Sequence, residues 1–245
     1  MTDWSDTAVA LDHVSKTFGD KQVLQDITFS VAPRETICIL GRSGTGKSVT
    51  LKLIIALMKP EAGHIWIDGD DITQLEGQEL SRVRRKMGFL FQNAALFDFL
   101  TLYDNLALPL QRLTRKSKPE IEEVIDRVLH QVGLSGDREK LPQELSGGMK
   151  KRAGLARALV LEPQILLVDE PSSGLDRITA SEIDELLLKQ KQHTTMIIVS
   201  HDVHGVRRLA DRVAVLEHGR LAALGKPQEL EHHENETVRG LVMEE

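Results

Sequence analysis

A glycine-rich segment between an apolar strand and a helix constrains this chain more than any other feature. Residues 41–48 read GRSGTGKS, the complete pattern G-x-x-x-x-G-K-[ST]. Residues 35–40 (ETICIL) are typical of a buried strand, and residues 49–57 can form a helix that ends before Lys59 and Pro60. The alternative is a glycine-rich turn that matches by chance, but the flanking signals argue against it. Strand, glycine loop and helix in this order predict an α/β fold with a phosphate loop.

This loop contains the groups that a polyphosphate needs. Glycines let the backbone bend tightly and turn its N–H groups toward an anion, and the helix N-terminus adds partial positive charge. Lys47 is predicted to reach the β- and γ-phosphates, and Ser48 to bind Mg²⁺. The sequence therefore predicts a site for ATP and Mg²⁺. The predicted nucleotide contacts in this loop are Gly41, Arg42, Ser43, Gly44, Thr45, Gly46, Lys47, Ser48 and Val49.

The composition narrows the remaining classes of function. The 245 residues carry a net charge of −6, and no uninterrupted apolar run approaches the roughly 20 residues of a membrane span. Residues 1–7 are polar and acidic, so we expect no signal peptide. The one cysteine, Cys38, lies in the strand before the loop and is predicted to be a small buried residue. These features predict a cytoplasmic protein, and its acidic balance argues against nucleic acid as a partner.

Two further strands end in residues suited to phosphate chemistry. Residues 164–169 (QILLVD) end in a carboxylate that is followed by Glu170, and residues 195–200 (TMIIVS) are followed by His201. Parallel strands bind ligands at their carboxyl edge. Asp169 is therefore predicted to hold Mg²⁺, and Glu170 to orient and polarise the attacking water. We expect His201 to contact the γ-phosphate or that water.

A second candidate anion site lies at residues 145–149 (LSGGM), before a predicted helix at 150–160. Ser146 is a good N-cap, while Gly147 and Gly148 expose backbone N–H groups at the helix start. One nucleotide does not need two such sites within one chain.

Taken in order, these motifs make residues 8–225 resemble an ATP-binding cassette (ABC) ATPase. The resemblance implies that Gln92 senses Mg²⁺ and the attacking water, and that Phe18 stacks on adenine. It also places Asp176, which ends SGLD, among the nucleotide contacts. In this family two cassettes pack head to tail, and each nucleotide lies between one phosphate loop and the other subunit's LSGG helix. Because this chain has one set of motifs and no internal repeat, it is expected to pair with a second copy of itself.

Pattern and resemblance together predict a RecA-like P-loop core with an N-terminal antiparallel β subdomain and an inserted helical subdomain. Residues 8–14 and 23–31 are predicted antiparallel strands, and residues 212–217 and 220–224 a hairpin. A capping box at residues 117–120 starts a helix with an apolar face. The cassette is expected to span 8–240, divided into a core at 8–92 and 160–225, helices at 93–159 and a C-terminal tail at 226–245.

Residues 93–110 are unusually apolar for a surface segment. In the family this region receives a helix of a separate transmembrane permease, and the expected contacts are Phe97, Phe99, Leu100 and Tyr103. The alternative is ordinary core packing, which we expect for about half of these side chains.

The wording of four motifs is similar to that of the ATPases of Mla/MCE lipid transporters. These motifs are GRSGTGKSV, FQNAALFDFLTLYDNLALPL, LSGGMKKR and DEPSSGLDRI. Met149 fits that group, whereas Arg177 stands where proline is usual. The resemblance implies phospholipid transport between inner and outer membranes, a location on the inner membrane through the permease, and an MCE-domain protein and small accessory subunits as partners. An importer of amino acids or other solutes, or a non-transport ABC protein, are the alternatives.

Overall fold

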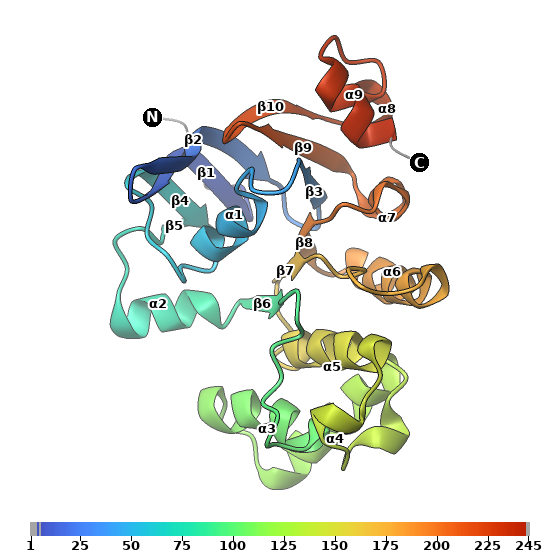
Figure 1. Cartoon of the computed structure of the whole chain (residues 1–245). Helices are drawn as coiled ribbons and strands as arrows, with labels where there is room; N and C mark the ends of the chain where they lie inside the picture. The colour runs from blue at the N-terminus through green and yellow to red at the C-terminus, as the bar shows by residue number, and fades with distance from the viewer. Residues whose placement is uncertain (1–3, 5, 244–245) are drawn as a thin grey trace.

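The computed structural model describes residue 4 and residues 6–243. In this part of the chain the strands form two sheets, one with the order β2-β1-β4-β5 and one with the order β10-β9-β3-β8-β7-β6 (Figure 1). The strands are β1 Val9–Phe18, β2 Lys21–Val31, β3 Thr36–Leu40, β4 Ala62–Ile67, β5 Asp70–Asp71, β6 Met87–Leu90, β7 Ile165–Asp169, β8 Thr195–Val199, β9 Arg212–Glu217 and β10 Arg220–Gly225. The helices are α1 Lys47–Ile54, α2 Gly77–Arg84, α3 Leu102–Leu113, α4 Lys118–Gln131, α5 Gly147–Leu159, α6 Arg177–Lys191, α7 Val203–Leu209, α8 Pro227–Leu230 and α9 Glu236–Met243, with short 3-10 turns at Ser135–Asp137 and Pro142–Glu144.

The first sheet is the predicted antiparallel subdomain. Strand β1 pairs antiparallel with both β2 and β4. Phe18 pairs with Lys21, so a two-residue turn joins β1 to β2. Gly19 sits in that turn at φ 56, a left-handed conformation that glycine adopts at little cost. The two strands are longer than the predicted ranges but run as expected.

The second sheet provides the edge on which the site is built. Strands β9, β3, β8, β7 and β6 are parallel neighbours, while β10 returns antiparallel to β9 as the predicted hairpin. Because the carboxyl ends of parallel strands meet at one edge, the segments after β3, β6, β7 and β8 emerge together. These are the segments that begin with the phosphate loop, Phe91-Gln92, Glu170 and Ser200-His201.

Two hydrophobic cores lie on opposite faces of this sheet. Successive strand residues point to opposite faces, so Ile37 and Ile39 of β3 pack in the core shared with α1 and the antiparallel sheet. Cys38 and Leu40 pack in the core shared with the helices of the other face. Burial on both faces explains why this strand is a continuous apolar run. The Cys38 thiol is fully buried, and that burial raises its pKa, which agrees with its predicted packing role.

Helices α3, α4 and α5 gather below the sheet in Figure 1, as the predicted inserted helical subdomain. The capping box at the start of α4 is present, because the Glu120 carboxylate accepts a hydrogen bond from the Ser117 backbone N–H at 2.7 Å. The limits 93 and 159 of this subdomain stay a prediction. None of the helices in the described residues combines the length and apolar composition of a bilayer crossing.

One expectation about a helix needs correction. Helix α1 covers Lys47–Ile54 instead of residues 49–57, because Ala56 takes a left-handed conformation (φ 56) and the N–H of Leu57 bonds back to the carbonyl of Lys52 at 2.8 Å. The C-terminal tail at 226–245 contains α8 and α9, and Val238 and Val242 are buried. Residues 244–245 of that tail, and part of the polar segment 1–7 for which we expected no signal peptide, lie outside the described residues.

Candidate nucleotide site

The phosphate loop follows β3 and is shaped by close backbone packing. A Cβ atom on Gly46 (φ 101) would lie 2.3 Å from Cδ2 of Leu24, and one on Gly41 would lie 2.4 Å from the carbonyl oxygen of Leu216. Glycine is therefore required at both positions. Gly46 is the N-cap of α1 and supplies no side-chain cap, so the N–H groups of the first helical turn point toward an anion in the loop.

Lys47 lies inside this loop. Its Nζ donates hydrogen bonds to the backbone carbonyls of Gly41, at 2.7 Å, and Arg42, at 3.1 Å. Burial lowers the pKa of the Lys47 ammonium, and the carboxylates of Glu170 and Asp169 oppose that effect. The structure therefore places a cation against two carbonyls of the loop, where a polyphosphate would need a positive charge.

Two of the three predicted metal ligands meet at the sheet edge. Ser48 Oγ donates a hydrogen bond to Asp169 Oδ1 at 2.9 Å, although the residues are 121 positions apart. Hydroxyl and carboxylate oxygens are the donors that Mg²⁺ prefers, and Mg²⁺ usually completes its shell with phosphate and water. The pair therefore fits a Mg²⁺ ion shared with a bound nucleotide. Gln92, the third predicted ligand, is exposed in the turn after β6, the strand next to β7.

Glu170 and His201 form a second pair beside the first. His201 Nε2 lies 3.0 Å from Glu170 Oε1, and the side chain of Glu170 is 11% exposed while that of His201 is 53% exposed. Burial raises the pKa of the Glu170 carboxyl, and the charges of His201 and Lys47 partly offset the increase. A carboxylate with a raised pKa is a stronger base, which suits the activation of water.

Sequence reasoning missed Lys151, a buried residue of α5. Its Nζ donates a hydrogen bond of 2.6 Å to the backbone carbonyl of Glu170, which has a left-handed φ of 49. Burial lowers the pKa of the Lys151 ammonium. Lys151 thus fixes the backbone that carries Glu170. Its burial could not be expected, because it sits in the run Lys150-Lys151-Arg152, a pattern typical of a solvated helix face.

The second glycine motif starts α5, as predicted. The Ser146 hydroxyl accepts a hydrogen bond from the N–H of Met149 at 3.2 Å, and both Ser146 and Gly147 are exposed. Gly148 packs against α6, since a Cβ there would lie 2.4 Å from Thr179 Cγ2. Figure 1 shows the start of α5 beside α6 and apart from α1, where the phosphate loop ends. The chain therefore carries two separate glycine-rich helix starts.

Asp176, which was predicted to contact nucleotide, is engaged as the N-cap of α6. Its Oδ1 accepts hydrogen bonds of 3.0 Å from the N–H groups of Ile178 and Thr179, and its Oδ2 accepts one of 2.7 Å from the Thr179 hydroxyl. These bonds lower the pKa of the Asp176 carboxyl. Arg177 is the first residue of α6. Proline suits this position because its φ is already helical. Arginine there leaves the cap intact, because the capping hydrogen bonds come from Ile178 and Thr179.

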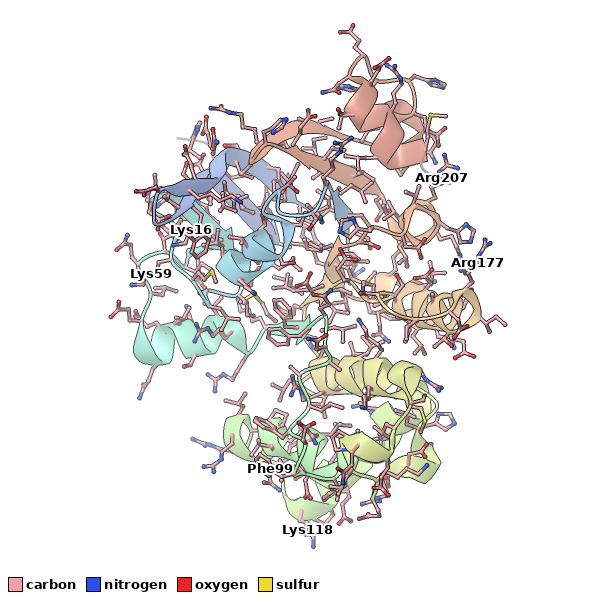
Figure 2. All side chains as sticks on the ribbon, in the orientation of Figure 1. Lys16, Lys59, Phe99, Lys118, Arg177 and Arg207 are labelled. Carbon is pink, nitrogen blue, oxygen red and sulfur yellow. The ribbon has the colours of Figure 1, made fainter. Side chains whose placement is uncertain are left out.

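The apolar segment after Gln92 is only partly on the surface. Phe97 and Phe99 are 43% and 79% exposed, whereas Leu100 and Tyr103 are half-buried (Figure 2 labels Phe99). The buried side chain of Asn105 holds the loop, because its Oδ1 accepts from the N–H of Phe97 at 2.8 Å and its Nδ2 donates to the carbonyls of Leu100 and Thr101. Two of the four expected permease contacts are therefore exposed, and none of the four is fully buried.

Comparisons with known proteins identify the family. A family model described as ABC transporter matches residues 24–173, more than half of the chain. The probable ribonucleotide transport ATP-binding protein mkl of Mycobacterium leprae is 42% identical over 234 residues, which are 95% of this chain and 67% of that protein. The methionine import ATP-binding protein MetN 1 of Bacillus thuringiensis subsp. konkukian is 40% identical over 224 residues, or 89% of this chain and 66% of that protein. The chain thus spans about two thirds of the length of these relatives.

A solved structure agrees with the sequence relatives. The dimeric, post-hydrolysis state of the ATP-binding cassette MJ0796 bound to ADP and Pi has a TM-score of 0.83 to this chain and is 33% identical. The matched region covers 89% of this chain and 98% of the MJ0796 chain. The chain therefore belongs to the ABC transporter family, as one of its ATP-hydrolysing cassettes.

Proposed function

We propose that two copies of this chain bind ATP head to tail and power a separate membrane permease. One observation carries the proposal: Lys47, the Ser48–Asp169 pair and the Glu170–His201 pair meet at one edge, while the glycine cap at Ser146 faces solvent elsewhere. A partner's Ser146, Gly147 and Gly148 would complete each nucleotide site. That MJ0796 is known as a dimer with ADP and Pi supports this arrangement.

Each of the site residues has a different role in the proposed hydrolysis. Lys47 and the loop N–H groups hold the phosphates, and Phe18 stacks on the base. Ser48, Asp169 and Gln92 would hold Mg²⁺, which when bound neutralises charge on the β- and γ-phosphates.

The chemical step then centres on the Glu170–His201 pair. Glu170 orients a water and accepts its proton as the water oxygen bonds to the γ-phosphorus and the bond to ADP breaks. His201 holds the Glu170 carboxylate and faces the γ-phosphate. Asp176, the N-cap of α6, would contact the nucleotide.

For the cargo, we propose phospholipid carried between inner and outer membranes, with the cassette held at the cytoplasmic face of the inner membrane by its permease. The wording of GRSGTGKSV, LSGGMKKR and DEPSSGLDRI supports this assignment. An MCE-domain protein and small accessory subunits would complete the complex. The names of the relatives, which concern ribonucleotide transport and methionine import, favour a second candidate, an importer of small solutes.

Purification of the native complex distinguishes the two cargos. The tagged chain is recovered from detergent-solubilised membranes with its untagged partners, and bound lipids are extracted and identified. A phospholipid transporter yields stoichiometric phospholipid and an MCE-domain partner. Recovery of a periplasmic solute receptor without enriched lipid would assign the chain to the second candidate.

The exposed loop gives a test of coupling. We expect Phe97→Asp with Phe99→Asp to keep ATP binding and to lower recovery of the permease about tenfold or more. Even an uncharged polar group buried without a partner costs about 1–3 kcal/mol, and an unpaired carboxylate in a docked apolar groove costs more. Both side chains are exposed, so the fold of the free chain is spared. Leu57→Asp, at a side chain that is 53% exposed on another segment, is the matched control. Unchanged permease recovery by the double variant would remove this loop from the interface.

A further inference from the structure

The end of strand β1, where Phe18 lies, is held by the sheet on one side only, because pairing with β4 stops at Ser15 while pairing with β2 continues to Phe18. The register of β1 with β2 shifts between Val14 and Lys16 and again between Lys16 and Thr17. Phe18 follows immediately, at the edge of the two-residue turn, and its ring is 44% exposed. Strand pairing therefore leaves the plane of this ring free to vary unless another segment holds it.

Residues 59–61, between α1 and β4, supply that support. Lys16 Nζ donates to Glu61 Oε1 at 2.7 Å and to the carbonyl of Lys59 at 2.8 Å, while Glu61 Oε2 accepts from the N–H of Thr17 at 2.8 Å. The N–H of Glu61 also bonds to the carbonyl of Ser15 at 3.0 Å. Four hydrogen bonds thus join this segment to the three residues before Phe18. Figure 2 labels Lys16 and Lys59 on the same side of the molecule.

This contact is better shielded than a typical surface ion pair. The shielding is on the lysine side, because the Lys16 side chain is only 13% exposed while that of Glu61 is 47% exposed. The pKa of the Glu61 carboxyl is lowered, chiefly by its hydrogen bond with Lys16. By contrast, the neighbouring pair of Lys59 and Glu76, also 2.7 Å long, is 60% and 77% exposed and contributes little.

Lys16 also touches the aromatic ring itself. Its Nζ lies over the Phe18 ring at 5.2 Å from the centroid, within the range of a cation–π interaction. One face of the ring is therefore covered by the ammonium group. Phe18 nevertheless stays 44% exposed, and a flat base is the part of a nucleotide that would stack on such a ring.

We propose that Lys16 and Glu61 are positioning residues that set the plane of Phe18 so that its ring receives the base of the nucleotide. This inference rests on the proposed role of Phe18 as the base platform. The same contacts would link the base site to the phosphate site, because residues 59–61 follow α1, and α1 begins at the phosphate loop. The β1–β2 hairpin packs on the same loop through Leu24 and Gly46.

The test compares a nucleotide with a phosphate chain that has no base. Lys16→Met and Glu61→Gln are assayed for ATP hydrolysis, and Mg²⁺–tripolyphosphate is used as a competitor. Both variants raise the KM for ATP by about three- to tenfold and leave kcat within about twofold, since a base stack is weakened and the phosphate chemistry is not. The inhibition constant of tripolyphosphate stays unchanged, and Lys16→Arg restores the KM. Lys59→Met, which removes only the exposed pair, is the matched control.

The outcomes separate this inference from the proposed function. If Phe18→Ala raises the KM for ATP but Lys16→Met and Glu61→Gln do not, the positioning role of Lys16 and Glu61 is wrong. Phe18 would then still be the residue that stacks on the base. If Phe18→Ala changes nothing, the role of Phe18 in the proposed function is wrong. If Lys16→Met weakens ATP and tripolyphosphate equally, Lys16 acts on the phosphates or on the fold, which overturns the inference.

Discussion

Glu170→Gln is expected to lower the ATP turnover number by about 10²- to 10⁴-fold while ATP still binds, because general-base catalysis accounts for a factor of that size. Glutamine keeps the shape of the side chain and can still meet His201, 3.0 Å away, but it cannot accept the proton of water. The backbone of residue 170 stays held by Lys151. Turnover is measured by phosphate release, and the dimer by size-exclusion chromatography with ATP.

The same variant should persist as an ATP-bound dimer, since hydrolysis no longer opens it. Glu162→Gln, which removes an exposed carboxylate paired with Arg127, is the control and should turn over normally. Because burial raises the pKa of Glu170, native turnover should fall as the pH drops through that raised pKa, at a higher pH than an ordinary glutamate would give. Normal hydrolysis by Glu170→Gln would mean that the base is elsewhere.

Lys47→Ala should weaken ATP binding by about 10²- to 10³-fold and remove hydrolysis, as expected for the loss of one preorganised charge at the phosphates. The Nζ that bridges the carbonyls of Gly41 and Arg42 is lost, so the loop loses its buried cation and keeps only the exposed Arg42. The fold should survive, because alanine is a strong helix former at the start of α1 and removal of a buried charge relieves a desolvation cost.

Fluorescent-nucleotide titration and thermal unfolding test the Lys47 prediction together. Lys52→Ala, one turn further along α1, is the matched control and should bind ATP normally. A large drop in the unfolding temperature of Lys47→Ala would assign the lost binding to the fold. Near-native turnover would contradict the role given to Lys47.

Much of the fold could be predicted because the central strands are buried on both faces. Strands β3, β7 and β8 are uninterrupted apolar runs, and the structure places each within one residue of the predicted range. Motif spacing then located Ser48 and Asp169 at one edge, since parallel strands bring their carboxyl ends together. The order and spacing of the motifs along the chain were sufficient to predict this part of the site.

Other features depend on tertiary contacts that leave no local pattern. Lys151 reads as a solvated lysine, yet it reaches the Glu170 carbonyl from another element. The Lys16–Glu61 pair joins residues 45 positions apart. Helices α8 and α9 are too short to be stable on their own. Burial of Val238 and Val242 against the rest of the protein stabilises α9. These contacts follow from packing between elements and could not be predicted from periodicity.

Mixing two inactive variants tests whether each ATP site is shared by two chains. Ser146→Arg blocks the glycine cap, and Lys47→Ala disables the phosphate loop, so each variant alone has no complete site. In a mixed dimer the intact loop of one chain faces the intact cap of the other. We expect an equal mixture to regain ATPase activity, up to about one quarter of the native rate, since half of the dimers are mixed and each of these has one working site of two. Full activity of Ser146→Arg alone, or a mixture no more active than its two parts, would contradict the shared site.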